Sequence, residues 1–389
     1  MKWTDFTFLL YLCISPIIFL VCRILPINEK KIVFMQMQGC GYGCSPKYIA
    51  EELLERNLDY DMVWEVLDVN ANNNLPDKIH SVKYYSFRGI YEFATSKAWV
   101  INSSMTMLIF KRKKQICLQT WHGFGPKKGR PETNGIIIST LRKIYVKMAA
   151  KKVDVYLSRS KLQEELEFVG DPVHLYNGPF LEVGTPRIDI LVNRPEDVRE
   201  NVCQKLNISP DKKILLYAPT FRKLFNRFDS DIDWMRCVSA LKKKFGGEWV
   251  ILIRMHPLVA DKNLDANLPG VELINASYYP DMQELLLISD ILITDYSSCS
   301  FDFALTQRLC MLYVPDMDEY LKNDKNFFMN LETLPFLLAK NNDELISSIN
   351  EFDSEKYSEE ILSFNKKYNS WEAGTASYQS VEWLLEKMN

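Results

Sequence analysis

The chain has 389 residues, 47% of them apolar, and a formal net charge of −3. This length suggests two or three domains with ample core, and the apolar fraction excludes an intrinsically disordered protein. The small net charge gives no general reason to expect nucleic-acid binding. Nine cysteines, with no arrangement that completes a zinc site, fit a reducing cytoplasm better than a secreted, disulfide-linked fold.

The amino-terminal segment is apolar from Phe6 to Cys22. Its length is borderline for a membrane span, and Pro16 lies in its middle. No small-residue cleavage site is evident, and Arg23 follows directly. We therefore expect an uncleaved anchor over residues 1–29, which spans the membrane or lies in its interface with the body of the protein on the cytoplasmic side. A buried helix of the first domain is the alternative.

Strand and helix patterns alternate along the rest of the chain, which predicts an α/β protein with parallel sheets covered by helices. Domains are expected at 30–193 and 213–353, joined by a polar linker at 194–212 and followed by helices at 354–389. Two such domains in series imply a cleft, with ligands at the carboxyl ends of strands. The predicted strands are 31–38, 62–67, 98–102, 116–120, 153–157, 213–217, 249–254, 271–274, 290–294 and 310–313.

The most informative stretch follows the apolar run 290–294. It reads Asp295-Tyr296-Ser297-Ser298 and leads into an amphipathic segment that contains Phe301 and Asp302. A strand, a polar turn and a helix aim free helix N–H groups at an anion, and two serine hydroxyls add donors for a phosphate. A serine that only caps the helix is the alternative.

Two other strand ends of the second domain carry cations. Arg254 and His256 follow the apolar strand W-V-I-L-I and suit a diphosphate, although a structural histidine is the usual fate of an isolated one. Thr220 and Arg222 follow the strand at 213–217, where an ordinary loop with solvated charges is the alternative.

In the first domain, His122 follows the predicted strand 116–120, and Gly123 makes it accessible. Histidine is the side chain best suited to accept a proton near neutral pH, but a structural histidine in a loop is the alternative. The glycine-rich run Gly39-Cys40-Gly41-Tyr42-Gly43 follows the first strand and predicts either a loop approached by the acceptor or a simple turn.

Basic residues are concentrated between Lys111 and Lys152. This segment contains twelve Lys or Arg residues and a single acidic residue, Glu132. Residues 135–152 form a basic amphipathic pattern that is typical of contact with an anionic membrane leaflet. A core-packed helix with a solvated basic face is the alternative. The basic side chains of this pattern are Arg142, Lys143, Lys147, Lys151 and Lys152.

Taken together, these motifs resemble the CDP-glycerol glycerophosphotransferase family of teichoic-acid and capsule synthesis. The resemblance covers roughly residues 31–313. The matching pieces are Trp121-His122-Gly123 with Lys127-Lys128, Gly184-Thr185-Pro186-Arg187-Ile188-Asp189, Ala218-Pro219-Thr220-Phe221-Arg222, Arg254-Met255-His256-Pro257, and Thr294-Asp295-Tyr296-Ser297-Ser298 with Phe301-Asp302.

The resemblance implies a GT-B architecture, in which two Rossmann-like domains face a central cleft. It implies transfer of a polyol phosphate from CDP-glycerol or a related CDP-polyol to a hydroxyl of an undecaprenyl-type lipid-linked glycan, with release of CMP at the cytoplasmic face of an anionic membrane. The alternative is a GT-B glycosyltransferase that uses a nucleotide sugar. No Asp-rich metal site is visible in the sequence, so no cofactor is certain, and Asp295 or Asp302 is the alternative site for a bound metal. A divalent-metal requirement and a homo-oligomer are both left open.

The resemblance also assigns roles to residues. His122 is the expected base, and His256 is the second catalytic group. Phe124-Gly125-Pro126 departs from the turn that many members carry, which leaves the acceptor and the polyol open. A single addition is at least as well supported as polymerisation. The expected donor-binding residues are Thr220, Arg222, Arg254, His256, Asp295, Ser297, Ser298 and Asp302; the expected acceptor-binding residues are Gly41, Tyr42, Trp121, Lys127 and Lys128.

Overall fold

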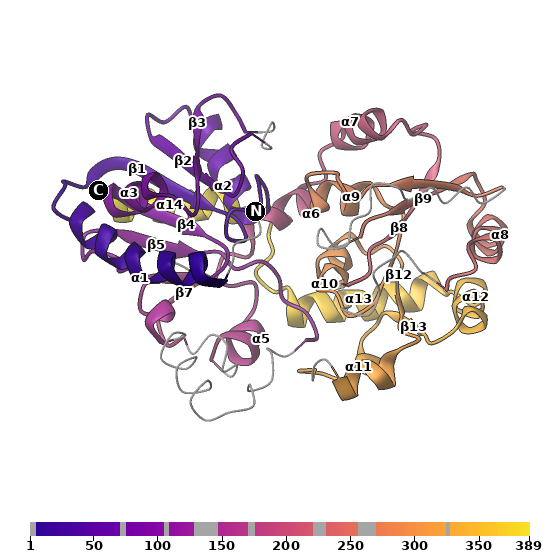
Figure 1. The fold of residues 1–389 in the computed structure, drawn as a ribbon. Coiled ribbons are helices and arrows are strands. Elements are labelled where there is room, and N and C mark those ends of the chain that lie inside the picture. The colour runs from indigo at the N-terminus through magenta and orange to yellow at the C-terminus, as the bar shows by residue number, and fades with distance from the viewer. Residues whose placement is uncertain are drawn as a thin grey trace. The chain divides into compact units, whose positions relative to one another are not determined.

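The computed structural model describes residues 5–70, 75–104, 109–127, 147–169, 176–220, 231–255, 270–323 and 327–389 (Figure 1). The chain divides into two compact units, each with its own parallel sheet. Unit 1 consists of Met1–His122, Glu132–Asp189 and Trp371–Asn389. Unit 2 consists of Gly123–Pro131 and Ile190–Ser370.

Unit 1 is built on a seven-stranded sheet with the order β3-β2-β1-β4-β5-β6-β7. All neighbouring strands are parallel, and Val33 of β1 pairs with Val63 of β2 on one side and Trp99 of β4 on the other. The chain order reverses between β1 and β4, which makes this pair the topological switch point of the sheet. The strands are β1 (Asn28–Met35), β2 (Asp61–Val66), β3 (Ile79–Lys83), β4 (Ser96–Ile101), β5 (Ile116–Gln119), β6 (Val155–Leu157) and β7 (Phe180–Leu181).

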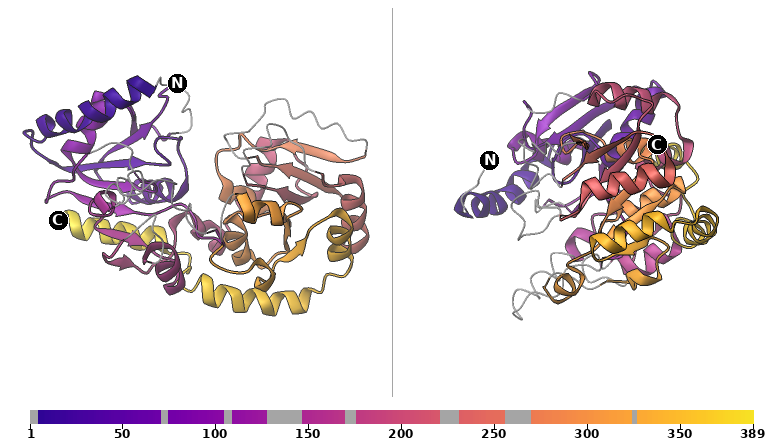
Figure 2. Two further views of the ribbon diagram at one scale, coloured as in Figure 1. Left: turned by 60° about the horizontal axis from the view of Figure 1, so that its bottom comes forward. Right: turned by 90° about the vertical axis from the view of Figure 1, so that its right-hand side faces the viewer.

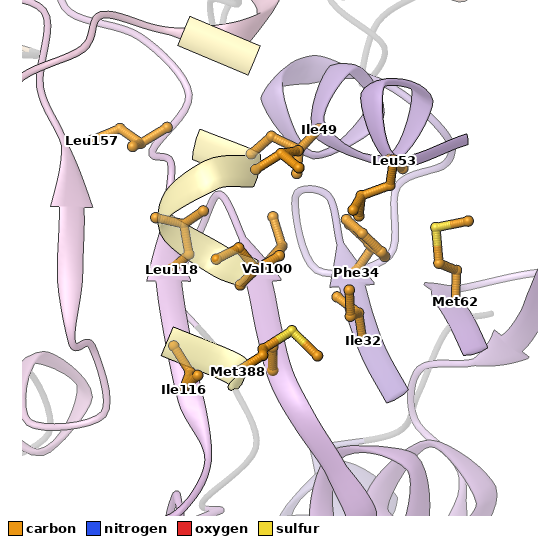
Figure 3. Close-up of a cluster of buried hydrophobic side chains, with 14 of the residues drawn as sticks. Ile32, Phe34, Ile49, Leu53, Met62, Val100, Ile116, Leu118, Leu157 and Met388 are labelled. Atoms are coloured by element: carbon orange, nitrogen blue, oxygen red, sulfur yellow. The ribbon is translucent and has the colours of Figure 1, made fainter. Parts of the chain in front are cut away.

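Both faces of this sheet are covered by helices, so its central strands contain continuous buried apolar runs, such as Ile32–Met35 of β1 and Ala98–Ile101 of β4. Ile32 and Phe34 of β1 contribute to one cluster beneath α2 (Cys44–Glu55) and α14 (Ala376–Met388), which Figure 3 shows. Val33 and Met35 contribute to the opposite cluster, beneath α1 (Asp5–Cys22) and α3 (Phe87–Thr95). Each large side chain buried in this way stabilises the fold by about 1.5–3 kcal/mol.

Helix α1 packs on unit 1 along one face and exposes an apolar face on the other side. Phe19 is fully buried, and its ring meets Trp99 edge-on at 6.5 Å. Figure 2 shows α1 and α14 on opposite faces of the sheet of unit 1. Among the described helices, none is long and apolar enough to cross a membrane. The exposed face of α1 consists of Ile14, Ile17, Leu20, Val21 and, just beyond its end, Ile24.

Unit 2 is built on a six-stranded parallel sheet with the order β10-β9-β8-β11-β12-β13, and its switch point lies between β8 and β11. Its strands are β8 (Lys213–Tyr217), β9 (Trp249–Ile253), β10 (Glu272–Asn275), β11 (Ile291–Thr294), β12 (Cys310–Tyr313) and β13 (Leu337–Ala339). Its helices include α7 (Asp197–Leu206), α8 (Trp234–Phe245), α9 (Met282–Ile288), α10 (Cys299–Phe303), α11 (Met317–Asn323), α12 (Asn342–Asn350) and α13 (Ser354–Tyr368).

Every strand predicted from the sequence is present, with ends shifted by at most three residues. Three strands were not predicted, namely β3, β7 and β13. All three lie at the edge of their sheets; β7 and β13 have only two and three residues, and β3 reads Ile-His-Ser-Val-Lys, with polar residues between its apolar ones. Their apolar pattern is therefore too weak to recognise in the sequence.

The segment predicted as a linker, 194–212, contains the helix α7, whose polar composition reflects its exposed surface. The carboxyl-terminal helices divide between the units, α13 with unit 2 and α14 with unit 1. Asp189 holds α14 to unit 1, because its carboxylate accepts the N–H groups of Ala376 at 3.0 Å and Ser377 at 2.7 Å. The motif Gly184–Asp189 therefore fixes the returning end of the chain.

Candidate active site

The catalytic candidate of unit 1 lies where three neighbouring strands end. Loops 36–43, 102–104 and 120–122 follow β1, β4 and β5, which are adjacent in the sheet. Because carboxyl ends of parallel strands share one edge, the three loops meet at the switch point, where α/β sheets bind ligands. His122 therefore lies in the part of unit 1 that the topology favours for a site.

The loop after β1 is a tight turn, and N–H groups of this turn donate to side chains of the loop after β4. Met37 and Gln38 have left-handed φ angles of 42° and 58°, and Gly39 has a φ of 93°. The N–H of Met37 donates to Oδ1 of Asn102 at 2.7 Å, and that of Gln38 to Oγ of Ser103 at 3.2 Å. Residues 102 and 103 thus hold a backbone conformation that is otherwise unfavourable for side-chain-bearing residues.

Gly41 and Tyr42, both predicted to contact the acceptor, pack against Trp64. The indole N–H of Trp64 donates to the main-chain oxygen of Gly41 at 3.0 Å, and the Tyr42 ring meets it at 4.6 Å. A Cβ added to Gly41 would meet no atom within 4 Å, so the loop has open space at this position. Their role in acceptor binding stays a prediction.

Trp121 is held in a strained conformation just before His122. Its φ is 53°, in the left-handed region, and its N–H donates to Oε1 of Gln119 at 3.1 Å. Its indole N–H donates to Glu167 at 2.9 Å. Glu167 lies in a π-helical turn, Glu164–Val169, a geometry that occurs often at functional sites. These bonds fix the direction from which the chain enters His122.

The imidazole of His122 is oriented by one hydrogen bond. Its Nδ1 lies 2.8 Å from the main-chain oxygen of Asn102. A carbonyl oxygen only accepts hydrogen bonds, so Nδ1 carries the hydrogen and donates it. In the neutral ring the lone pair is then on Nε2, which is the form that a general base requires.

The surroundings of His122 keep the ring uncharged. Burial is the largest cause that lowers its pKa from 6.5 to about 4, and the nearby Arg187 cation lowers it further. The hydrogen bond to Asn102 acts in the opposite direction. Arg187 is itself buried, in the 3-10 turn Pro186–Ile188, and the sequence had assigned it no role. The imidazole is therefore available to accept a proton at neutral pH.

In unit 2, the loop after β8 is fixed by the residue after β11. Asp295 is buried, and both its carboxylate oxygens accept the N–H of Thr220, at 3.0 and 2.9 Å. The Thr220 hydroxyl also donates to it at 3.0 Å. Asp295 and Thr220 thus support the loop at the switch point of unit 2. Whether they also contact a donor stays a prediction.

Ser297 and Ser298 lie at the start of α10, which has only five residues. The Ser297 hydroxyl accepts the N–H of Cys299 at 3.4 Å, and no side-chain cap is formed by Ser298. Both side chains are partly exposed. They stay donor-binding candidates, but the helix is too short for its dipole to contribute much.

The unusual turn Phe124-Gly125-Pro126 has a structural explanation within unit 2. Phe124 is buried and meets Phe301 edge-on at 5.6 Å. A Cβ on Gly125 would lie 2.8 Å from Cα of Ser298, and one on Gly123 would lie 2.6 Å from its Oγ. A side chain at position 125 would clash with the main chain of Ser298, whereas one at position 123 would displace the Ser298 side chain, so this turn is shaped by its close approach to Ser298.

Arg254 and Asp302 are both engaged in unit 2. Nη1 of Arg254 donates to the main-chain oxygens of Ala276, at 3.2 Å, and Tyr279, and burial lowers its pKa. Asp302 is buried and accepts from Nε2 of Gln283 at 3.1 Å. In the described residues no group of three or more His, Cys, Asp or Glu side chains could hold a metal ion. Arg222, His256 and Lys128 lie outside the described residues.

The predicted basic stripe is described only in part, since Arg142 and Lys143 lie outside the described residues. Lys147 and Lys151 are exposed. Lys152 is buried, and burial lowers its pKa to about 8. It therefore does not belong to a surface that faces lipid, contrary to the prediction from the sequence. The main chain of Lys127 forms an isolated antiparallel β-bridge with that of Phe327, and the Lys127 ammonium lies 5.8 Å from the centre of the Tyr320 ring.

Two consecutive α/β units, each with a parallel sheet and motif residues at its switch point, make this a GT-B-like protein. The model of the CDP-Glycerol:Poly(glycerophosphate) glycerophosphotransferase family matches residues 17–386. The chain therefore belongs to this family of transferases, as its motifs predicted.

Individual relatives agree with this assignment. A teichoic acid poly(glycerol phosphate) polymerase of Bacillus spizizenii is 32% identical, over 96% of this chain and 96% of the relative. A teichoic acid glycerol-phosphate transferase of Staphylococcus aureus is 30% identical, over 92% of this chain and 94% of the relative. A solved structure of a wall teichoic acid polymerase TagF variant soaked with CDPG matches with a TM-score of 0.81 and 28% identity, over 93% of this chain and 90% of that chain.

The state of His122 is directly measurable. We expect a pKa of about 4 and a hydrogen on Nδ1 in long-range 1H–15N NMR spectra of the four histidines, with the His122→Ala spectrum giving the assignment. Because the usual pKa is 6.5, acid protonates the unfolded chain first, and the contribution of His122 to stability falls as the pH drops from about 6.5 to 4. A pKa near 6.5, or a hydrogen on Nε2, would contradict this description.

Proposed function

We propose that this chain transfers glycerol phosphate from CDP-glycerol to a hydroxyl of a lipid-linked acceptor in teichoic-acid synthesis, releasing CMP. The observation that carries the proposal is the neutral His122 ring, whose Nδ1 is bound to Asn102 and whose Nε2 is left to accept a proton. Membership of the family supports the donor, and the relatives named for glycerol-phosphate transfer support the polymer.

The reaction is a direct displacement at phosphorus. The acceptor O–H bond breaks and its proton passes to Nε2 of His122. The acceptor oxygen forms a bond to the phosphorus that carries glycerol. The bond from that phosphorus to the CMP oxygen breaks in line, and its electron pair leaves with CMP.

The low pKa of His122 has a consequence for when it acts. A ring with a pKa of about 4 binds protons weakly in the absence of substrate. The donor diphosphate carries negative charge, and a negative charge near an imidazole raises its pKa by favouring the imidazolium form. In the proposed reaction the negative charge of the donor therefore makes His122 a stronger base at the moment of transfer.

The donor diphosphate is assigned to unit 2. Thr220, Arg254, Ser297 and Ser298 lie after three strands at or next to its switch point, and Arg222 and His256 belong to the same loops in the sequence. Cations and hydroxyls there stabilise the charge that develops on the leaving oxygens. Asp295 and Asp302 support this site through their bonds to Thr220 and Gln283. The acceptor is assigned to unit 1, over Gly41, Tyr42 and Trp121.

The protein is further proposed to lie on the cytoplasmic face of the membrane. The exposed face of α1 provides apolar area, with Ile17 and Val21 exposed by 61% and 60%. Lys147 and Lys151 add exposed positive charge, and the sequence adds Arg142 and Lys143. An apolar face combined with basic residues suits the interface of an anionic leaflet. Such contact brings the enzyme to a lipid-linked acceptor.

Replacement of His122 tests the catalytic proposal. We expect His122→Ala to lower turnover by roughly 10²–10⁴-fold, the range for loss of a general base, with little change in CMP affinity. CMP release from CDP-glycerol is measured with a lipid-linked acceptor, with CDP-ribitol and UDP-sugars in parallel. His80→Ala, at an exposed position of β3, is the matched control. Near-normal turnover in His122→Ala, or nucleotide release from UDP-sugars alone, would refute the proposal.

Nucleotide binding tests the donor site. Arg254→Ala, His256→Ala and the Ser297→Ala/Ser298→Ala double variant should each weaken CDP binding in calorimetry by roughly 10–100-fold, because each removes a charge-assisted partner of the diphosphate. Arg236→Ala, which removes an exposed arginine of α8, should bind CDP normally. If all three site variants bind like the wild type, unit 2 does not hold the donor in the way proposed.

Membrane contact is tested by making the exposed face of α1 polar without touching Phe19. Each buried side chain contributes on the order of 1 kcal/mol, so Ile17→Gln/Val21→Gln/Ile24→Gln should weaken binding to phosphatidylglycerol vesicles by roughly 100-fold. The control is Met235→Gln/Leu362→Gln, which alters two apolar residues exposed by 58% and 51% in unit 2. Unchanged vesicle binding by the triple variant would remove α1 from the membrane surface.

A further inference from the structure

We propose that Asn102 is a positioning residue that couples the loop after β1 to the base His122. It follows the end of β4, the strand that lies between β1 and β5 in the sheet. Its main-chain oxygen accepts from Nδ1 of His122 at 2.8 Å, and its side-chain Oδ1 accepts the N–H of Met37 at 2.7 Å. One residue thus binds both the base and the loop predicted to meet the acceptor.

The orientation of the Asn102 amide follows from its partner. The N–H of Met37 is a donor, so the atom that faces it is the oxygen and the amide nitrogen points elsewhere. That nitrogen is buried and has no hydrogen-bond partner among the described residues. A buried donor without an acceptor is destabilising and unusual in a native protein, so the site bears this cost together with the bond that the Asn102 oxygen makes to Met37.

The loop depends on this support. Met37 and Gln38 both adopt left-handed φ angles, and their N–H groups donate to side chains and not to a neighbouring strand. Asn102 accepts the first and Ser103 the second. A displacement of the loop is therefore transmitted to the main chain of residue 102, whose oxygen determines the tautomer and the direction of the His122 ring.

The inference rests on the proposed role of His122, but its readout does not need turnover. Asn102→Leu has a similar volume and lacks the acceptor for Met37. We expect it to lose the single Nδ1–H tautomer of His122 in long-range 1H–15N NMR spectra and to lower turnover by roughly 10–100-fold through misplacement of the base. CDP affinity, a property of unit 2, should not change.

Two variants separate positioning from a general loss of structure. Asn102→Asp keeps an oxygen that accepts from Met37, so it should restore the Nδ1–H tautomer and most of the turnover. Ser103→Ala removes the equivalent bond to Gln38 but no bond to His122, so it should leave the His122 tautomer intact. If Asn102→Leu does not fold, as judged by circular dichroism and CDP binding, Asn102→Asp and Ser103→Ala decide the question.

A wild-type tautomer and wild-type turnover in Asn102→Leu would overturn the inference. Loss of the Nδ1–H tautomer in Ser103→Ala would also overturn the inference, and so would its loss in a folded Asn102→Asp. Either result would show that the side-chain oxygen of residue 102 does not determine the tautomer of the His122 ring. Normal turnover in His122→Ala would instead contradict the proposed function, and it would leave the NMR result of the Asn102 variants to be read independently.

Discussion

The hydrogen bond from Nδ1 of His122 to the main-chain oxygen of Asn102 is the interaction on which the proposed chemistry of unit 1 depends. Without it the ring has no fixed tautomer, and the lone pair proposed to accept the proton of the acceptor has no fixed direction. The bond joins the end of β5 to the end of β4, so the sheet itself sets the distance between its partners. The left-handed Trp121, held by Gln119 and Glu167, brings His122 to that position at a cost in backbone strain.

The loops at the switch points of the two units are held by the same kind of hydrogen bond. A loop at a switch point leaves the sheet and loses its ladder of hydrogen bonds, so its N–H groups need other acceptors. In unit 1, Asn102 after β4 accepts from Met37 after β1; in unit 2, Asp295 after β11 accepts from Thr220 after β8. In each case the supporting residue comes from the strand beside the one that the loop follows. This arrangement holds both loops where ligands bind to parallel sheets.

Much of the fold follows from the sequence, because strands covered on both faces are continuous apolar runs. The edge strands β3, β7 and β13 could not be predicted, because β7 and β13 are too short and β3 is too polar to show that pattern. His122 was proposed as the base because a histidine at a strand end stands out in the sequence. Asn102 was not, since one polar residue after an apolar strand is ordinary in a sequence and its importance lies in contacts from three segments. Burial of Lys152 was equally hidden, because a run of lysines does not show which of them turns inward.

The central claim is that His122 acts as a base in a single displacement and does not form a covalent bond to phosphorus. The stereochemistry at phosphorus distinguishes these mechanisms most directly. A CDP-glycerol analogue made chiral by sulfur at the glycerol-bearing phosphorus is transferred to the acceptor, and the configuration of the product is determined. One in-line displacement by the acceptor oxygen predicts inversion of configuration. Retention would require two displacements and a phosphorylated enzyme, and it would contradict the account given for His122.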